Sequence, residues 1–343
     1  MLKDFARKCL YASGVLGLYH RLRNADSLTV VMFHRTLRPD DPRWSGCDPD
    51  YTITEGLFAR SLDFFSKHYH VVSLDDVVRA RRSGGSLPPR ALLISFDDGW
   101  LDNLDYALPA LRRTGLPAVM FVAADAVGAG QPFFQERIIA AWRRGHLSVE
   151  ALAAGVVAQG GGHAPDHGIA GLRQLIAALE QMSPERRKTA LQAHAEALDD
   201  GMRHMVDVED LPRLRTGGIE LGLHGKSHVA MTRAEDLDAE LGGAQAALRA
   251  MLGLPADDAT SACRTMSFPH GAYDGEIAVR ARESGYELVF TSVPVLNAVG
   301  ERPEWLLGRT GFETDTVTDA RGRFRADWLA WYLFRRPVRR LSC

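Results

Sequence analysis

Cysteine is scarce in this chain of 343 residues: its four cysteines are too few and too scattered for a disulfide framework or a CxxC metal site. No apolar run approaches the roughly 20 residues that span a bilayer. Neither sign of charge prevails, because the chain has 41 Lys and Arg residues and 43 Asp and Glu residues. The composition therefore predicts a globular protein of a reducing compartment, without the basic field on which nucleic-acid binding draws.

Both ends of the chain combine basic residues with apolar ones. Residues 1–26 have a basic start and a short apolar stretch but no clear cleavage site, which favours a retained helix over an export signal. Residues 316–343 predict a basic aromatic helix that either lies on an anionic lipid surface or packs its aromatics on the core. Its aromatic residues include Trp328, Trp331, Tyr332 and Phe334.

Short apolar runs alternate with stretches of helical period, the pattern of a parallel sheet covered by helices. Strands are predicted at 27–33, 91–96, 118–123, 219–224, 264–269 and 287–292. Helices are predicted at 57–69, 101–115, 207–218, 233–253 and 276–285. The α/β class follows, with an incomplete or distorted (β/α) barrel of about seven strands as the architecture and the site at the carboxyl ends of the strands.

The pattern divides the chain into five parts. Between about 133 and 205 the βα alternation stops and the sequence becomes rich in Ala, Arg and Leu at helical spacing, without a chemical signature. The predicted parts are an N-terminal helix at 1–26, the first part of the barrel at 27–132, a helical insertion at 133–205, the second part of the barrel at 206–315 and the C-terminal helix at 316–343.

Polar residues that bind metals or move protons follow several of the predicted strands. Asp97 and Asp98 follow a buried strand, and Gly99 supplies a turn that separates the two carboxylates; a solvated loop in which Asp98 caps the next helix is the alternative. A tight turn would bring His224 and His228 to one point. His163 and His167 have the same spacing, but their glycine-rich surroundings offer no rigid support.

One carboxylate and two imidazoles form a ligand set that leaves positions open on a Zn²⁺-like ion. A second carboxylate beside such an ion is suited to accept a proton from an attacking water. Asp98, His224 and His228 are the candidate ligands, and Asp97 is the candidate base.

Three segments carry a family resemblance: SFDDG at 95–99, HGKSH at 224–228 and SFPHGAYD at 267–274. Together they resemble the first three motifs of the NodB-homology polysaccharide deacetylases, carbohydrate esterase family 4, and the similarity covers most of 27–310 except the insertion. The resemblance implies a NodB-like barrel with Asp97 as the general base. It also implies a divalent metal ion, most readily Zn²⁺, bound by Asp98, His224 and His228. It places the backbone amide near His270 at the oxyanion.

The chain departs from many members of that family, because no histidine follows His270 to supply the Leu-x-His general acid. A branch resembling exopolysaccharide N-deacetylases takes this histidine from the first strand, in a Tyr-His-Arg setting that Phe33-His34-Arg35 matches. His34 is therefore predicted as the general acid, with a buried structural imidazole as the alternative. Arg309 is predicted with His270 among the substrate-binding residues; it either orients a catalytic carboxylate or is a surface arginine.

The predicted reaction is hydrolysis of N-acetyl groups in an amino-sugar glycan or a lipid-linked saccharide. Two other functions stay open: a metal-dependent hydrolase of a small non-sugar amide, and a catalytically silent carbohydrate-binding barrel. The basic, aromatic termini predict an enzyme of the cytoplasm that contacts the inner face of the membrane, with no nucleic-acid partner.

Overall fold

The computed structural model describes residues 2–162, 166–255, 261–311 and 314–342. The chain divides into two compact units. The first unit comprises Met1–Arg38, Asp50–Ala129 and Met205–Cys343, and the second comprises Pro39–Pro49 and Gly130–His204. The second unit thus combines most of the expected insertion with a short segment from the first part of the chain.

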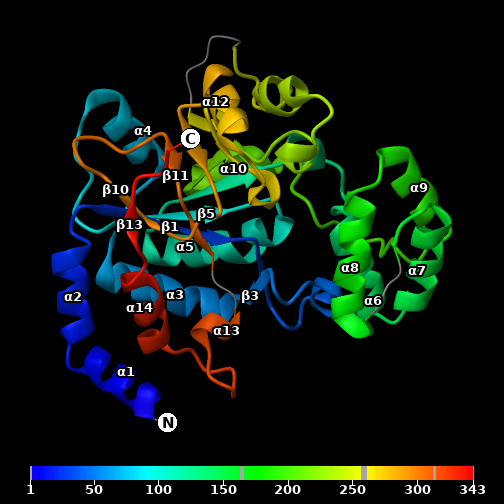
Figure 1. The fold of residues 1–343 in the computed structure, drawn as a ribbon. Helices are drawn as coiled ribbons and strands as arrows, with labels where there is room; N and C mark the ends of the chain where they lie inside the picture. The colour runs from blue at the N-terminus through cyan, green and yellow to red at the C-terminus, as the bar shows by residue number, and fades with distance from the viewer. Residues whose placement is uncertain (1, 163–165, 256–260, 312–313, 343) are drawn as a thin grey trace. The chain divides into compact units, whose positions relative to one another are not determined.

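The first unit is built on a largely parallel sheet (Figure 1). Its main strands, in spatial order, are β11 (Leu306–Leu307), β9 (Leu288–Phe290), β8 (Thr265–Ser267), β7 (Ile219–Leu223), β6 (Ala118–Val122), β5 (Ala91–Phe96) and β1 (Ser27–Phe33). Nearly every residue of these strands is buried, which is the pattern of parallel strands covered on both faces. The six predicted strands are confirmed within one or two residues at each end, and β11 was not predicted.

One short segment reaches both ends of the parallel series. Residues 306–307, as β11, pair with β9, and β12 (Thr310–Gly311) pairs in parallel with β1. Different residues make the two pairings, so the strands form a distorted barrel and not a regularly closed one. The predicted α/β architecture of about seven strands is confirmed.

Five further short strands extend the structure. β10 (Leu296–Ala298) runs antiparallel to β1 and pairs with β13 (Val338–Arg339), β4 (His70–Val71) pairs with β5, and β2 (Arg35–Leu37) pairs with β3 (Thr52–Thr54). None of them was predicted. Two or three residues are too few to show a period of two, and their pairing is decided by distant segments.

Alternate residues of the strands belong to two different hydrophobic clusters. Leu28, Leu93 and Phe121 pack in a cluster with residues of α4, whereas Val31 and Ile94 pack in the larger cluster with most of the other helices of this unit. The helices are α1 (Leu2–Ala12), α2 (Val15–Arg23), α3 (Glu55–His68), α4 (Leu74–Ser83), α5 (Leu108–Thr114), α10 (Asp210–Gly217), α11 (Ala244–Met251), α12 (Gly275–Glu283), α13 (Thr314–Val317) and α14 (Ala326–Phe334).

Several predicted helices differ in extent from those in the structure. The residues at 1–26 form two helices, α1 and α2, because the backbone turns at Gly14 with φ of 81°. The helix predicted at 233–253 begins at residue 237 and contains a π-helical turn at Ala239–Gly243, and another π-helical turn, Asn103–Ala107, precedes α5. In the region 316–343 the helix α14 covers only Ala326–Phe334.

The second unit has a hydrophobic core of its own. It contains the short 3₁₀ helix Pro42–Gly46 and α6 (Phe134–Arg143), α7 (Val149–Ala158), α8 (Gly168–Glu180) and α9 (Pro184–Gln192). Ile138, Leu152, Leu172 and Leu179 are fully buried in this core. The helical character predicted for this region is therefore what the described residues show.

The helices α1, α2 and α14 pack on one another in the first unit (Figure 1). His20 of α2 stacks on Phe334 of α14 with ring centroids 4.0 Å apart. Asn24 Nδ2 donates to the carbonyl oxygen of Phe334 and lies 2.9 Å from Nδ1 of His20. The C-terminal helix thus uses Phe334 and the apolar residues Leu329 and Leu333 to pack on the core.

The contact between α2 and α14 is expected to weaken in acid. Burial lowers the pKa of His20 from 6.5 to about 3, so its neutral form stabilises the fold above pH 6.5 and this contribution is lost as the pH falls below 6.5. The loss amounts to about 1.4 kcal/mol per pH unit, or roughly 2 to 3 kcal/mol at pH 4.5. Substituting His20→Phe keeps a stacked ring without a titrating group.

The measurement is the difference in unfolding free energy between wild type and His20→Phe, taken by denaturant titration from pH 7.5 to pH 4.5. The pKa of the neighbouring His68 is also lowered, to about 4, but His68 is present in both proteins and its effect largely cancels. The difference should shift in favour of the variant as the pH falls. A difference that does not change with pH would contradict the expected role of His20.

Candidate metal and catalytic site

The turn after β5 separates its two adjacent carboxylates. Asp98 and Gly99 both have positive φ, 79° and 96°, and a Cβ at Gly99 would lie 3.3 Å from Cγ1 of Val122. Asp98 Oδ2 accepts a hydrogen bond from the indole of Trp100, and no side chain caps the helical turn that follows at Asn103–Ala107. The turn predicted at Gly99 therefore directs Asp97 and Asp98 toward different partners.

His224 follows β7 and is held in a defined tautomer. Its Nδ1 lies 3.0 Å from the carbonyl oxygen of Ser267 and 2.6 Å from the hydroxyl of the same residue. Because a carbonyl oxygen only accepts, Nδ1 must carry the proton, and Nε2 is left with its lone pair. A hydrogen-bond acceptor for the ring nitrogen that does not bind the ion is the arrangement that orients metal-binding histidines.

Four residues after His224, a tight turn places His228 beside it. Gly225 and His228 have φ of 69° and 63°. The buried carboxylate of Glu240 accepts the backbone N–H groups of Lys226 and Ser227 at 2.8 and 3.0 Å and the hydroxyl of Ser227 at 2.5 Å. Glu240 thus fixes the middle of the turn from which both imidazoles project.

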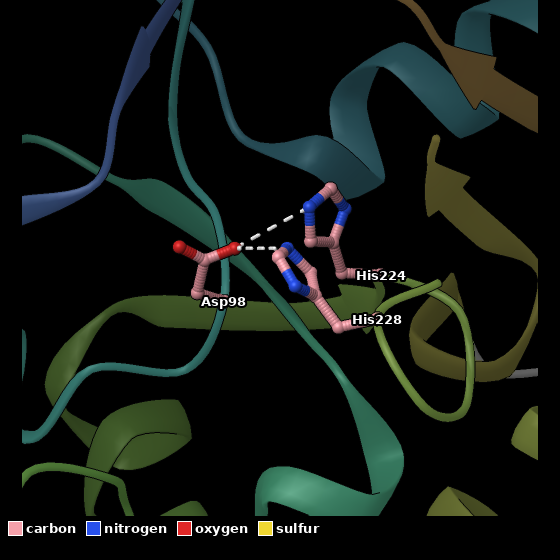
Figure 2. Close-up of side chains that lie close together, drawn as sticks. All are labelled: Asp98, His224 and His228. Carbon is pink, nitrogen blue, oxygen red and sulfur yellow. Dashed lines mark ion pairs between the residues drawn. The ribbon is translucent and has the colours of Figure 1, made fainter. Parts of the chain in front are cut away.

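Asp98, His224 and His228 converge on one point (Figure 2). Oδ1 of Asp98 lies 3.4 Å from Nε2 of His224 and 3.2 Å from Nε2 of His228. Ligands bound tetrahedrally at about 2.1 Å from one zinc ion lie about 3.4 Å apart. Among the described residues none hydrogen-bonds this buried Oδ1 with regular geometry, so the donor set and the orphaned oxygen fit a divalent ion.

Asp97 lies beside this cluster and is clamped by Arg309. The two terminal nitrogens of Arg309 each donate to a different oxygen of Asp97 at 2.7 Å, and Nε donates to the carbonyl oxygen of Thr291. Ser267 Oγ donates to Asp97 Oδ1 at 3.1 Å. Arg309 is fully buried, so the structure has the carboxylate-orienting arrangement and not a surface arginine.

Opposing effects set the charge of this site. Burial acts to raise the pKa of Asp97, but the guanidinium of Arg309 together with the charges of His224 and His34 outweighs it, and the pKa lies below its ordinary value. Burial acts in the same way on Asp98, and the charges of His228, His34 and His224 bring its pKa well below the usual range. Burial lowers the pKa of His224 to about 4. At neutral pH both carboxylates are ionised and His224 is neutral, the forms that bind a cation.

Comparison with known protein families found one family that matches the chain. Residues 84–289, more than half of the chain, match the family described as polysaccharide deacetylase. The chain belongs to this family. It is accordingly a hydrolase of carbon–nitrogen bonds, and the resemblance seen in the three sequence motifs is confirmed. No curated protein matches the chain.

Three solved structures of deacetylases share the fold of this chain. The Streptococcus pyogenes deacetylase PplD in complex with acetate is 13% identical, with 90% of this chain and 98% of that chain covered and a TM-score of 0.56. IcaB from Ammonifex degensii is 18% identical, with coverage of 90% and 97% and a TM-score of 0.55. The de-N-acetylase from Aggregatibacter actinomycetemcomitans is 15% identical, with coverage of 85% and 97% and a TM-score of 0.53.

His34 of this deacetylase lies between β1 and β2, close to the carboxylate pair. Its charge acts on both Asp97 and Asp98 and lowers their pKa values. Asn103 Nδ2 donates to its backbone oxygen at 2.8 Å, and the ring packs edge-on against Tyr51 with centroids 4.9 Å apart. His34 and Tyr51 line a cavity of ≈ 280 Å³, so the imidazole is accessible from solvent and is not sealed in the core.

A buried network that the sequence did not reveal supports the segment carrying His34. Asp102 accepts the Nε–H of Arg35 and the backbone N–H of Thr36, both at 2.9 Å. The guanidinium of Arg35 stacks 4.2 Å from the ring centre of Trp100, whose indole donates to Asp98. The candidate acid and the candidate metal ligand are thereby held by one set of contacts.

The deacetylase site also concentrates backbone strain. In the described part of the chain four non-glycine residues have positive φ, and three of them are Asp98, His228 and His270. Each such residue costs about 1–3 kcal/mol and persists only where its surroundings enforce it. His270, with φ of 57°, places Nε2 3.2 Å from the carbonyl oxygen of His228, its ring packed against that of His228.

Glu240→Gln is expected to weaken metal binding while the fold survives. A glutamine amide keeps one acceptor oxygen where the carboxylate uses two, so the turn between His224 and His228 loses part of its support. Removing such a supporting partner typically costs 10- to 100-fold in metal affinity. Competition with a chromophoric chelator measures the affinity, and Glu276→Gln, an exposed carboxylate on α12, serves as the control. Equal affinities for both variants would contradict the role of Glu240.

The remaining sequence candidates fall outside this site. His163 lies outside the described residues, so its spacing from His167 has no structural counterpart here. His167 is 96% exposed in its side chain and lies near Glu150 in the second unit. Among the described residues, Asp98, His224 and His228 are the one group that could share a metal ion.

Proposed function

We propose that this polysaccharide deacetylase is a divalent-metal-dependent enzyme that hydrolyses N-acetyl groups of an amino-sugar glycan or lipid-linked saccharide. The observation that carries the proposal is the convergence of Asp98, His224 and His228 beside a clamped carboxylate, Asp97. A divalent ion held by these ligands supplies Lewis-acid chemistry: it lowers the pKa of a water and polarises a carbonyl oxygen. Zinc is the expected ion, because the donors are two imidazoles and one carboxylate.

Asp97 is suited to take the proton of the attacking water. Arg309 holds both of its oxygens, and Oδ2 lies 3.9 Å from Nε2 of His224, so the carboxylate faces the ligand cluster. Its orientation is fixed before the reaction, which removes a reorganisation cost from the transition state. As the water oxygen bonds to the acetyl carbon, one water proton passes to Asp97.

His34 is suited to protonate the departing nitrogen. The carbon–nitrogen bond then breaks with the proton of the His34 imidazole passing to the amine, and the products are acetate and a free amino sugar. The backbone amide near His270 would stabilise the oxyanion. With this role for His34, we propose that the chain belongs to the branch that carries its acid in a Tyr- or Phe-His-Arg setting.

The cavity beside His34 supports a sugar substrate over a small amide. Tyr51, 46% exposed, and Asp50 line it together with His34, and such aromatic and acidic side chains suit stacking on a sugar ring and hydrogen bonding to its hydroxyls. The leaving amine of an amino sugar would occupy the side of the site on which His34 lies. The expected location, the cytoplasm at the inner membrane face, stays a prediction.

Acetate release tests the proposed function. The metal-loaded chain is incubated with N-acetylglucosamine oligomers, peptidoglycan fragments and polyprenyl-linked N-acetyl sugars, with Asp97→Asn as the inactive control. Acetate from at least one sugar substrate, lost in the control and on chelation, is the expected result. Turnover only of small non-sugar amides would overturn the substrate assignment, and bound metal without release from any substrate would favour a silent binding protein.

A further inference from the structure

Helix α2 carries two apolar stripes on opposite faces. Leu16 and His20 face the core and are buried. On the other face lie Val15, Leu18 and Leu22, with exposed fractions of 51%, 55% and 75%. Their spacing, completed by Tyr19 between them, follows the helical period, so these side chains form one continuous outward stripe.

Helix α1, which packs against α2, adds a further exposed apolar side chain, Phe5, which is 66% exposed. Five of the ten exposed large hydrophobic side chains in the described ranges lie in these two short helices. Single exposed hydrophobic residues need no explanation, but a concentration of this kind marks a binding surface. We call the surface made by Phe5, Val15, Leu18, Tyr19 and Leu22 the α1–α2 face.

Cationic side chains border the α1–α2 face. Lys3, Lys8, Arg21 and Arg23 are all exposed, and by the helical period Arg21 and Arg23 lie on the two sides of the α2 stripe. Asp4, the one acidic residue of the two helices, pairs with Lys8 as well as with Arg7 and Arg325. One carboxylate thus serves three cations, and the border of the face keeps an excess of positive charge.

We propose that the α1–α2 face binds the surface of an anionic lipid bilayer. Leucine, phenylalanine and tyrosine on one side of a helix, flanked by Lys and Arg, are the composition of helices that lie in the membrane interface. Anionic headgroups pair with the bordering cations and add about 1 kcal/mol for each one near the surface. The chain rests on the membrane by this face, since no described helix is long and apolar enough to cross it.

Charge favours a lipid surface over a second copy of the chain as the occupant. An isologous contact would place the same face on both partners, so a border with an excess of cations would meet an identical border. Like charges in such a contact are repulsive. In the C-terminal helix Leu329, Leu333 and Phe334 are buried in the core, whereas Trp328, Trp331 and Tyr332 are half-buried. The proposal goes beyond the proposed reaction and does not depend on it.

Flotation of the full chain with vesicles tests the proposal. Vesicles of equal parts phosphatidylcholine and phosphatidylglycerol should carry the wild type, and vesicles of phosphatidylcholine alone should carry about tenfold less. The double variant Leu18→Glu/Leu22→Glu should lose binding by about tenfold or more, because two exposed leucines leave the stripe. Val279→Glu, at a 42% exposed position on α12, is the matched control and should bind like the wild type.

Three outcomes would overturn the proposal: no flotation of the wild type with the anionic vesicles, equal flotation of the double variant, or a concentration-dependent dimer that the double variant abolishes while vesicles are not bound. Acetate release from a soluble N-acetylglucosamine oligomer is measured in parallel. It should be the same in wild type and double variant, which also shows that the variant is folded. A failure of that assay in both proteins concerns the proposed reaction and leaves the flotation result to stand by itself.

Discussion

Substituting His228→Ala is expected to remove nearly all deacetylase activity, by about 10³-fold or more, because one of three candidate ligands is lost from a site whose ion contributes several kcal/mol to the transition state. Nε2 of His228 lies 3.2 Å from the orphaned Oδ1 of Asp98, so no other imidazole replaces it easily. The side chain lies in a loop after β7 and not in the hydrophobic core. The fold should therefore survive the substitution.

The measurements are kcat/KM for acetate release and the amount of bound metal after dialysis, together with a thermal unfolding curve. His146→Ala removes an exposed histidine of the second unit and should leave all three unchanged. Wild-type turnover by a metal-loaded His228→Ala chain would show that the three side chains do not share a functional ion.

Arg309→Met is expected to lower both stability and activity. Removing one partner from a buried ion pair leaves an uncompensated charge and costs about 3–5 kcal/mol. Asp97 and Arg309 are both almost fully buried, and their two bonds of 2.7 Å are lost together. A misoriented base should reduce acetate release by about 10²-fold or more.

The stability effect of Arg309→Met should depend on pH in a defined direction. With Arg309 present the pKa of Asp97 is lowered, so the ionised carboxylate stabilises the wild type at neutral pH and this contribution is lost as the pH falls. Without Arg309, burial acts to raise the pKa of Asp97 and only the charges of His224 and His34 oppose it, so this pKa is higher than in the wild type and ionisation at neutral pH stabilises the variant less. The gap in unfolding free energy should widen from acid to neutral pH.

A double substitution tests whether the loss of stability in Arg309→Met comes from the unpaired charge of Asp97. Asp97→Asn together with Arg309→Met removes both charges, and its unfolding free energy at neutral pH should exceed that of Arg309→Met alone. Arg309→Lys keeps the charge but cannot make the two parallel bonds, and it should fall between wild type and Arg309→Met in activity. A double variant no more stable than Arg309→Met would show that the pair is not the cause.

The central strands were predictable because burial on both faces requires mostly apolar residues, and such a run is visible in the sequence. The runs at 27–33 and 91–96 are continuous apolar segments, and β1 and β5 have the same bounds. The short strands β10, β12 and β13 could not be predicted in this way, since two or three residues are too few to show an apolar run or an alternating pattern. The helix expected at 233–253 starts later because its amphipathic pattern extends through residues that the structure places in a turn.

The candidate site was predictable only as far as local motifs reach. Asp97, Asp98, His224 and His228 follow strands at which parallel topology brings side chains together. Glu240, Asp102 and Trp100 act through contacts that form only in the folded chain, and in the sequence each belongs to an ordinary polar or amphipathic stretch. The sequence could not decide whether Arg309 orients a carboxylate or lies on the surface, because its carboxylate partner is 212 positions earlier in the chain.

The segment at 306–311 has a consequence for how the enzyme matures on the ribosome. All three candidate ligands precede residue 229, whereas Arg309 belongs to the residues that join the two ends of the parallel series. A nascent chain therefore contains all three candidate ligands before it contains the arginine that clamps Asp97. Asp97 can reach its clamped orientation only after the segment at 306–311 has been synthesised and has paired with both ends of the series.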